Sequence, residues 1–174
     1  MVTTKRDSPP VFKGLSWYRE QYFSLFVPID WSRSPWPDGR MGVLFSPTAE
    51  DGETLLGVEV QDLGFEFQAE DKDELMAGFL EGIHALAGVE LEEQKDWVVG
   101  NLICLEAKYS YLEGGTRRKR WTRVFYDKTR QLSFIAQGSS PEAFAYWLPM
   151  FYEAMMMSRV HQQKPSIAAE QIEV

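Results

Sequence analysis

The chain has 174 residues, 44% of them hydrophobic and 14% aromatic, which is enough for one domain with a sizeable core. No apolar run approaches the roughly 20 residues that cross a bilayer, and the first residues lack the apolar segment of a signal peptide. The single cysteine, Cys104, excludes an internal disulfide. We therefore expect a cytoplasmic protein without membrane insertion.

The formal net charge of -8 is unevenly distributed along the chain. Residues 50–96 carry fifteen acidic residues against two lysines, whereas residues 113–130 carry seven basic residues against two acids. The overall acidity makes nucleic acid an unexpected partner, because counterion release rewards a dense cationic surface. The basic stretch is therefore the feature of the sequence that most needs an explanation.

The first third of the chain is predicted to be rich in strands. Residues 15–22 fit a short helix that leads into the first strand, and Pro28 ends that strand because proline cannot donate to the ladder. Residues 30–39 hold two prolines, an Asp-Gly pair and two tryptophans, which is typical of an irregular loop. Three strands are expected here, the last two joined by a turn at 48–53: residues 23–28, 40–47 and 54–64.

The first long helix is predicted over residues 70–88. Asp71, with Glu74 three residues on, resembles a capping box, and Gly88 occupies the position of a left-handed C-cap. Its apolar residues recur at helical spacing and form one stripe: Leu75, Met76, Phe79, Leu80, Ile83 and Leu86.

Four strands with short, turn-like connections come next, so neighbours should be antiparallel; they cover residues 89–99, 101–112, 119–127 and 131–137. A second helix begins with Ser139 or Ser140 as N-cap and Pro141 in its first turn, and Pro149 is expected to kink it. One face of this helix gathers its apolar side chains: Phe144, Trp147, Leu148, Phe151 and Met155.

This order of elements predicts an α+β fold, since strands follow one another and the helices stand apart from them. We expect a central antiparallel sheet of about six to seven strands, sandwiched by helices in an α/β/α arrangement. The domain should run over residues 15–160. Residues 1–14 and 161–174 are expected to be flexible tails, because they lack apolar periodicity.

The basic stretch allows two interpretations. Its strand alternates side chains between two faces, and its cations could either meet an anionic partner or pair across strands with acids such as Glu106 or Glu113. Pairs of the second kind contribute roughly 0.2–1 kcal/mol each, and we favour this structural interpretation.

Trp31 and Trp36 in the long loop similarly either close the end of the core, which we favour, or supply a contact surface. The residues of a possible partner surface are Trp31, Trp36, Arg117, Arg118, Arg120, Trp121 and Arg123.

Groups suited to catalysis are scarce. The two histidines are His84, in the first helix, and His161, at the start of the C-terminal tail. Cys104 lies within an apolar strand, where a buried thiol behaves as a small hydrophobe. The acidic runs lack the alternating oxygen positions of a calcium loop. We therefore expect no enzymatic activity, no metal and no cofactor.

Several segments resemble the PsbP-like family, which also includes the nuclear-import factor Mog. "FVPIDW" supplies the proline-then-tryptophan element that closes the first strand, at Pro28 and Trp31. "LSFIAQGSSPEAF" matches the late strand and the turn into the last helix, at 133–136 and 139–144. The resemblance implies an antiparallel sheet between helices and non-enzymatic accessory work on a larger assembly. It carries no functional residue over to this chain.

Two functions follow as hypotheses. The first is an interaction module that docks on a protein partner, near Trp31, Trp36 and the predicted hairpin that carries residues 117–123. The second is a small-ligand or lipid-binding domain, in which the many aromatic residues line a cavity between sheet and helix.

Overall fold

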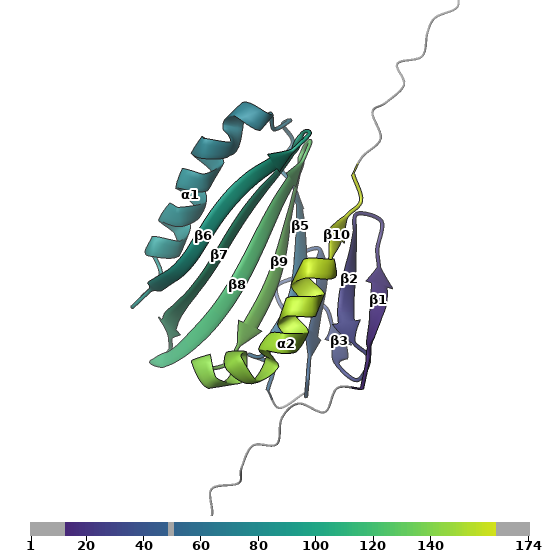
Figure 1. The fold of residues 1–174 in the computed structure, drawn as a ribbon, viewed down its shortest axis with the longest axis vertical. Helices are drawn as coiled ribbons and strands as arrows, with labels where there is room; N and C mark the ends of the chain where they lie inside the picture. The colour runs from purple at the N-terminus through teal and green to yellow at the C-terminus, as the bar shows by residue number, and fades with distance from the viewer. Residues whose placement is uncertain (1–12, 49–50, 163–174) are drawn as a thin grey trace, which may run out of the picture.

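The computed structural model describes residues 13–48 and 51–162, so the predicted tails fall almost entirely outside the described residues. Within these residues the chain forms a seven-stranded sheet, a three-stranded sheet and two α-helices (Figure 1). The predicted α+β class with a central antiparallel sheet is confirmed. The spatial order of the large sheet is β3 (Ser32–Ser34), β4 (Gly42–Ser46), β5 (Leu55–Asp62), β9 (Arg130–Gly138), β8 (Thr116–Asp127), β7 (Leu102–Glu113) and β6 (Glu90–Val99).

The strands β6 to β9 form a meander because their connections are tight turns. Gly114 and Gly115 both have positive φ, at 56° and 79°, which suits the two-residue turn between β7 and β8. Strand β9 then pairs with β5 over eight residues, from Leu55 opposite Gln137 to Asp62 opposite Arg130. This long-range pairing joins the meander to the N-terminal strands.

The small sheet corrects the sequence analysis. Residues 15–19, predicted as part of a helix, form a strand that pairs with the segment predicted as the first strand. A helix of about two turns is weak in isolation, whereas aromatic residues such as Trp17 and Tyr18 favour strands and here contact Phe26 and Phe45. The order of this sheet is β1 (Leu15–Arg19), β2 (Phe23–Pro28) and β10 (Arg159–Val160).

The two helices cover opposite faces of the large sheet. Helix α2 (Pro141–Met157) and the small sheet pack on one face, which contains Trp121 and Phe125. Helix α1 (Lys72–His84) packs on the other face, which contains Val124 and Tyr126 (Figure 1). Successive residues of β8 thus belong to different cores, as strand alternation requires.

The start of helix α1 differs from the prediction. A short 3-10 turn, η1 (Ala69–Asp71), precedes the helix. The Asp71 carboxylate accepts a hydrogen bond from the backbone N–H of Gln68 at 2.7 Å, so it closes this turn and does not cap α1 with Glu74. The helix also ends at His84 with Ala85 as C-cap, ahead of the predicted Gly88.

Helix α2 begins as predicted. Ser140 is the N-cap, and its hydroxyl accepts a hydrogen bond from the Ala143 N–H at 3.0 Å. Gly138 lets the helix start close to the sheet, because a Cβ at this position would lie 2.4 Å from the Phe144 nitrogen. Leu148, predicted to face the core, is 39% exposed because it lies at the edge of the buried stripe.

Candidate functional site

A groove of about 970 Å³ lies between α1 and the sheet, and we call it the α1 groove. Its floor comes from residues of β7, β8 and β9: Tyr109, Arg120, Val124, Tyr126 and Gln131. The helix and the segments before and after it supply the remaining walls, among them Phe65, Phe67, Leu75, Phe79, Ile83 and Leu86. Aromatic and aliphatic residues therefore make up more than half of the residues that line the groove, and polar or charged residues supply much of the rest.

The groove exists because α1 covers only part of its face of the sheet. The helix packs against β6 and β7, where the buried Met76 and Ile83 meet the strands. Gly78 and Gly82, one turn apart on the groove side, have nothing within 4 Å of an added Cβ. These two glycines thus leave space between this flank of the helix and the floor of the groove.

The charged side chains that line the groove come from the helix and from the floor. Asp71, Glu74 and Glu81 belong to η1 and α1, and Arg120 belongs to β8. Burial raises the pKa of the Tyr126 phenol above its ordinary value, so this floor residue is neutral at physiological pH. Arg120 is the single cation among the described residues that line the groove.

Arg120 is held by two neutral neighbours. Its Nε donates a hydrogen bond to Oε1 of Gln137 at 2.8 Å, and its Nη2 donates to the Tyr111 hydroxyl at 2.8 Å. The Tyr111 hydroxyl in turn donates to Oε1 of Gln137 at 3.0 Å. The guanidinium also lies 5.1 Å from the centroid of the Tyr111 ring. These contacts fix the orientation of the cation at one end of the groove.

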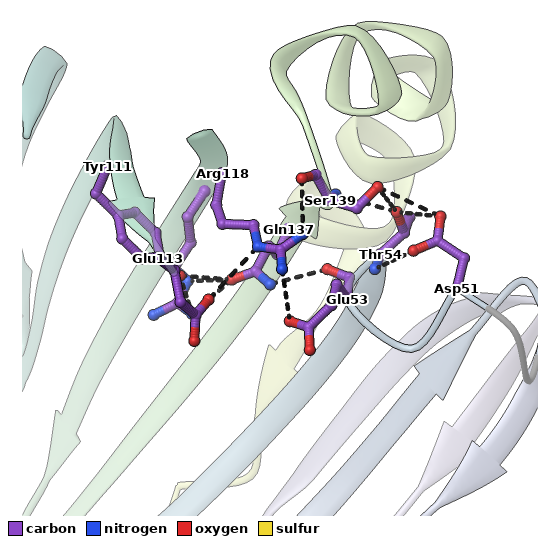
Figure 2. A network of polar contacts seen from close by, with 9 residues as sticks. Asp51, Glu53, Thr54, Tyr111, Glu113, Arg118, Gln137 and Ser139 are labelled. Atoms are coloured by element: carbon purple, nitrogen blue, oxygen red, sulfur yellow. Dashed lines mark hydrogen bonds and ion pairs between the residues drawn. The ribbon is translucent and has the colours of Figure 1, made fainter. Parts of the chain in front are cut away.

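Gln137 continues into a polar network that ties the elements together (Figure 2). Its Nε2 donates to the carbonyl oxygen of Glu53 at 2.8 Å, and Arg118 donates to the Ser139 carbonyl oxygen at 2.8 Å. Further along, the Thr54 hydroxyl donates to the Asp51 carboxylate at 2.8 Å. The network joins the start of β5, the end of β9 and the start of α2, so it stabilises the fold at the edge of the groove.

The structure buries most of the residues predicted for a partner surface. Trp31 is 7% exposed, with its ring centroid 5.2 Å from that of Trp147. Trp36 is equally buried, and its Nε1 donates to the Val58 carbonyl oxygen at 2.9 Å. Trp121 is 1% exposed. The interpretation of the loop tryptophans as closing the core is confirmed.

The arginines of the predicted surface have different environments. Arg123 is 8% exposed, forms an ion pair with Glu106 at 3.0 Å and donates to the Met155 carbonyl oxygen at 2.6 Å. The predicted pairing with Glu106 is therefore confirmed, and both partners of the pair are buried. Among the seven predicted residues, the partly exposed ones are Arg117, Arg118 and Arg120. Contact between these arginines and a partner protein stays a prediction.

The scarce nucleophilic and basic groups lie apart from the groove lining. Cys104 is fully buried, and burial raises the pKa of its thiol to about 12, which keeps it protonated and unreactive. His84 is exposed at the last residue of α1, and His161 hydrogen-bonds the Ser24 hydroxyl at 2.7 Å.

In the part of the chain that the structure describes, no three potential metal ligands gather in one place. In the same residues, neither helix has the length and apolar character needed to cross a bilayer.

Comparison with known proteins supports the fold. No protein-family model matches the chain, and no curated protein matches its sequence. Among solved structures, the cyanobacterial PsbP of Synechocystis sp. PCC 6803 superposes with a TM-score of 0.58 and 13% identity, over 87% of this chain and 95% of that one. The fold is PsbP-like.

Two further proteins share this PsbP-like fold. LpqN of Mycobacterium tuberculosis, a protein involved in cell envelope biogenesis, has a TM-score of 0.56 and 12% identity over 79% of this chain and 82% of its own. PA94 of Pseudomonas aeruginosa, a protein of unknown function, has a TM-score of 0.52 and 13% identity over 88% and 99%. At such identities the likeness concerns the fold alone. The resemblance to Mog stays a prediction.

The sequence analysis expected an aromatic-lined cavity between sheet and helix but named none of its residues. Two signals pointed to them. Tyr109, which lines the groove, and Tyr111, which holds Arg120, are separated by one residue, so they share a face of their strand. Gly78 and Gly82 stand four residues apart in a helix and therefore on one flank. Neither signal shows which side of the sheet α1 leaves open, because that depends on long-range packing.

Proposed function

We propose that this protein is a non-enzymatic binding module and that it takes up a small amphipathic molecule in the α1 groove. The observation that carries the proposal is the groove itself, with its aromatic floor and one fixed cation. Ligand sites typically measure about 300–1,000 Å³ and combine apolar walls with a few fixed polar groups. The α1 groove has this size and this composition.

The aromatic contacts within the groove suit an apolar ligand body. Phe67 and Tyr126 pack with their ring centroids 4.8 Å apart, and both are less than 10% exposed. Phe65 also lines the groove and packs on Phe67, but it is 60% exposed, so much of its ring is in contact with water. A ligand that covered Phe65 would remove apolar surface from water, which contributes about 25 cal/mol per Å².

Binding of a neutral fluorophore tests the proposal. N-phenyl-1-naphthylamine is apolar and uncharged, so its fluorescence should rise saturably when it enters the groove. Gly78→Leu should abolish this rise, because the new side chain fills open space inside the groove. His84→Leu is the matched control: it adds the same side chain to an exposed position of α1 that does not line the groove.

Two results would overturn the proposed function. One is the absence of saturable binding to the folded wild-type protein. The other is equal binding to the wild type and to Gly78→Leu, which would place the fluorophore elsewhere. Native mass spectrometry of the freshly isolated protein provides a further readout, since a retained small molecule should be absent from the Gly78→Leu variant.

A second candidate function is docking on a protein partner, the accessory role implied by the resemblance to the PsbP-like family. The specific observation in its favour is an exposed apolar stripe along α2, formed by Leu148, Tyr152 and Met156 at intervals of four residues. Such a stripe fits an apolar protein surface, and methionine adapts well to such contacts. Replacing all three residues by glutamate should abolish co-purification of a partner from the host, whereas Gly78→Leu should not. This assignment would be contradicted if the triple glutamate variant still bound the partner. It would also be contradicted if Gly78→Leu lost the partner as well.

A further inference from the structure

The basic residues of β8 differ in how their charge is neutralised. Four of them form an ion pair with a carboxylate of β6 or β7: Arg117 with Glu90 at 3.6 Å, Arg118 with Glu113 at 3.5 Å, Lys119 with Glu92 at 2.8 Å and Arg123 with Glu106 at 3.0 Å. Most of the cations in the basic stretch are therefore paired with carboxylates of the same chain.

Arg120 is the exception on this strand. No carboxylate among the described residues lies within 4.0 Å of its guanidinium, and its hydrogen-bond partners are the amide of Gln137 and the phenol of Tyr111, whose pKa burial raises, so both are neutral. It is also the basic residue of β8 that lines the α1 groove. The one cation of the strand without a carboxylate therefore faces the space where a ligand would lie.

The guanidinium keeps donors free for such a ligand. Nε and Nη2 are used by Gln137 and Tyr111, whereas Nη1 has no hydrogen-bond partner in residues 13–48 and 51–162 and is not a buried atom. Gln137 is 2% exposed and donates a hydrogen bond to the Glu53 carbonyl oxygen. The side chain that orients the Arg120 guanidinium is therefore itself fixed in position. A pre-oriented cation loses little freedom when it binds an anion.

We propose that Arg120 binds the carboxylate of an amphipathic monocarboxylic acid, with the apolar body of the acid lying along Val124, Tyr126 and Phe67. This inference rests on the proposed function of the α1 groove. One guanidinium matches one negative charge, and a charge-assisted hydrogen bond of this kind is about twice as strong as a neutral one. Three carboxylates also line the groove; they repel any anion, and they repel a phosphate dianion about twice as strongly as a monocarboxylate: Asp71, Glu74 and Glu81.

Competition with the bound fluorophore tests the inference. Decanoate, 1-decanol and decyl phosphate share one chain length and differ in the head group, and all three would be titrated near neutral pH against N-phenyl-1-naphthylamine. We expect decanoate to bind the wild type about tenfold more tightly than decanol, the gain from one charge-assisted hydrogen bond, and more tightly than decyl phosphate. Arg120→Met should lose the preference for decanoate and keep the affinity for decanol.

Controls separate this inference from the proposed function. Arg117→Met removes a partly exposed arginine of the same strand that is paired with Glu90, and should leave the preference intact. Arg120→Lys, which retains the charge, should keep part of the preference, and thermal unfolding checks that each variant is folded. Equal binding of decanoate and decanol to the wild type, or a preference that survives in Arg120→Met, would overturn the role of Arg120 alone. Absence of fluorophore binding would overturn the proposed function as well.

Discussion

The two faces of the large sheet are built from the same strands but have opposite characters. On the α2 face, the helix and the small sheet close over a core in which Trp121, Phe134 and Phe151 are at most 1% exposed. On the α1 face, the helix covers β6 and β7 and leaves a groove beside them. The comparison shows that covering a sheet with one helix on each side does not make the two sides equivalent.

The contrast extends to charge. Arg123 and Arg120 lie three residues apart on β8 and so belong to opposite faces. Arg123, on the closed face, forms an ion pair with Glu106 and donates a hydrogen bond to a backbone carbonyl oxygen in the last turn of α2. Arg120, on the open face, contacts neutral groups. We infer that the closed face sets the stability of the domain, whereas the open face is available for binding.

The largest effect on this comparison should come from Glu106→Gln. The glutamate is 3% exposed, and its removal leaves the buried guanidinium of Arg123 without a carboxylate. Breaking a buried pair in this way costs about 3–5 kcal/mol of unfolding free energy, measured by urea denaturation. The double variant Glu106→Leu with Arg123→Met should recover much of the loss. A loss below about 1 kcal/mol in Glu106→Gln would show that water reaches the pair and that this face is not closed.

Gly138→Ala should have the next largest effect. The added methyl would lie 2.4 Å from the backbone nitrogen of Phe144, where neither the strand nor the start of α2 can give way cheaply. Overpacking of this kind costs about 1–3 kcal/mol, again measured by urea denaturation. Gly100→Ala is a poor control because its φ is positive, whereas Gly82→Ala, in open space on the other face, should not destabilise the protein.

Local patterns in the sequence predicted much of this architecture. The meander of four strands follows from short turns, and the start of α2 follows from Ser140 and Pro141, so both depend on a few adjacent residues. The alternation of β8 likewise predicted which side chains share a face. The sequence could thus divide the side chains of the basic strand between two faces of the sheet, but it could not show on which face they would be buried.

The rest depended on contacts between distant segments. The small sheet needs β10 to pair with β2, where Arg159 lies opposite Ser24, and no local pattern specifies such a partner. The burial of Arg123 depends on the position of the last turn of α2. The α1 groove depends on how far the helix reaches across the sheet. The candidate site was therefore less predictable than the fold, because it is a space left between elements.

Alkaline pH should weaken the closed face through Cys104. Burial raises the pKa of its thiol from 9.0 to about 12, so near pH 10 the thiol is ionised in the unfolded chain and protonated in the folded one. A group with a raised folded pKa loses its stabilising contribution as the pH rises above the unfolded value, here by about 1.4 kcal/mol near pH 10. Urea denaturation near pH 8 and pH 10 should show this decrease in the wild type and a smaller one in Cys104→Ala. Equal decreases in both proteins would assign the effect to other groups, such as Tyr111 and Tyr126, whose pKa values burial also raises.

The smallest effect should come from Gly78→Ala on the open face, and its sign is opposite to the others. Gly78 lies inside α1, and an added Cβ there meets nothing within 4 Å. Alanine should therefore stabilise the protein by about 0.5–1 kcal/mol, because glycine loses more backbone entropy in a helix. The same methyl is too small to fill the groove, so fluorophore binding should persist, unlike in Gly78→Leu. A destabilised Gly78→Ala would mean that this flank of α1 is packed in solution, and the open face would then resemble the closed one.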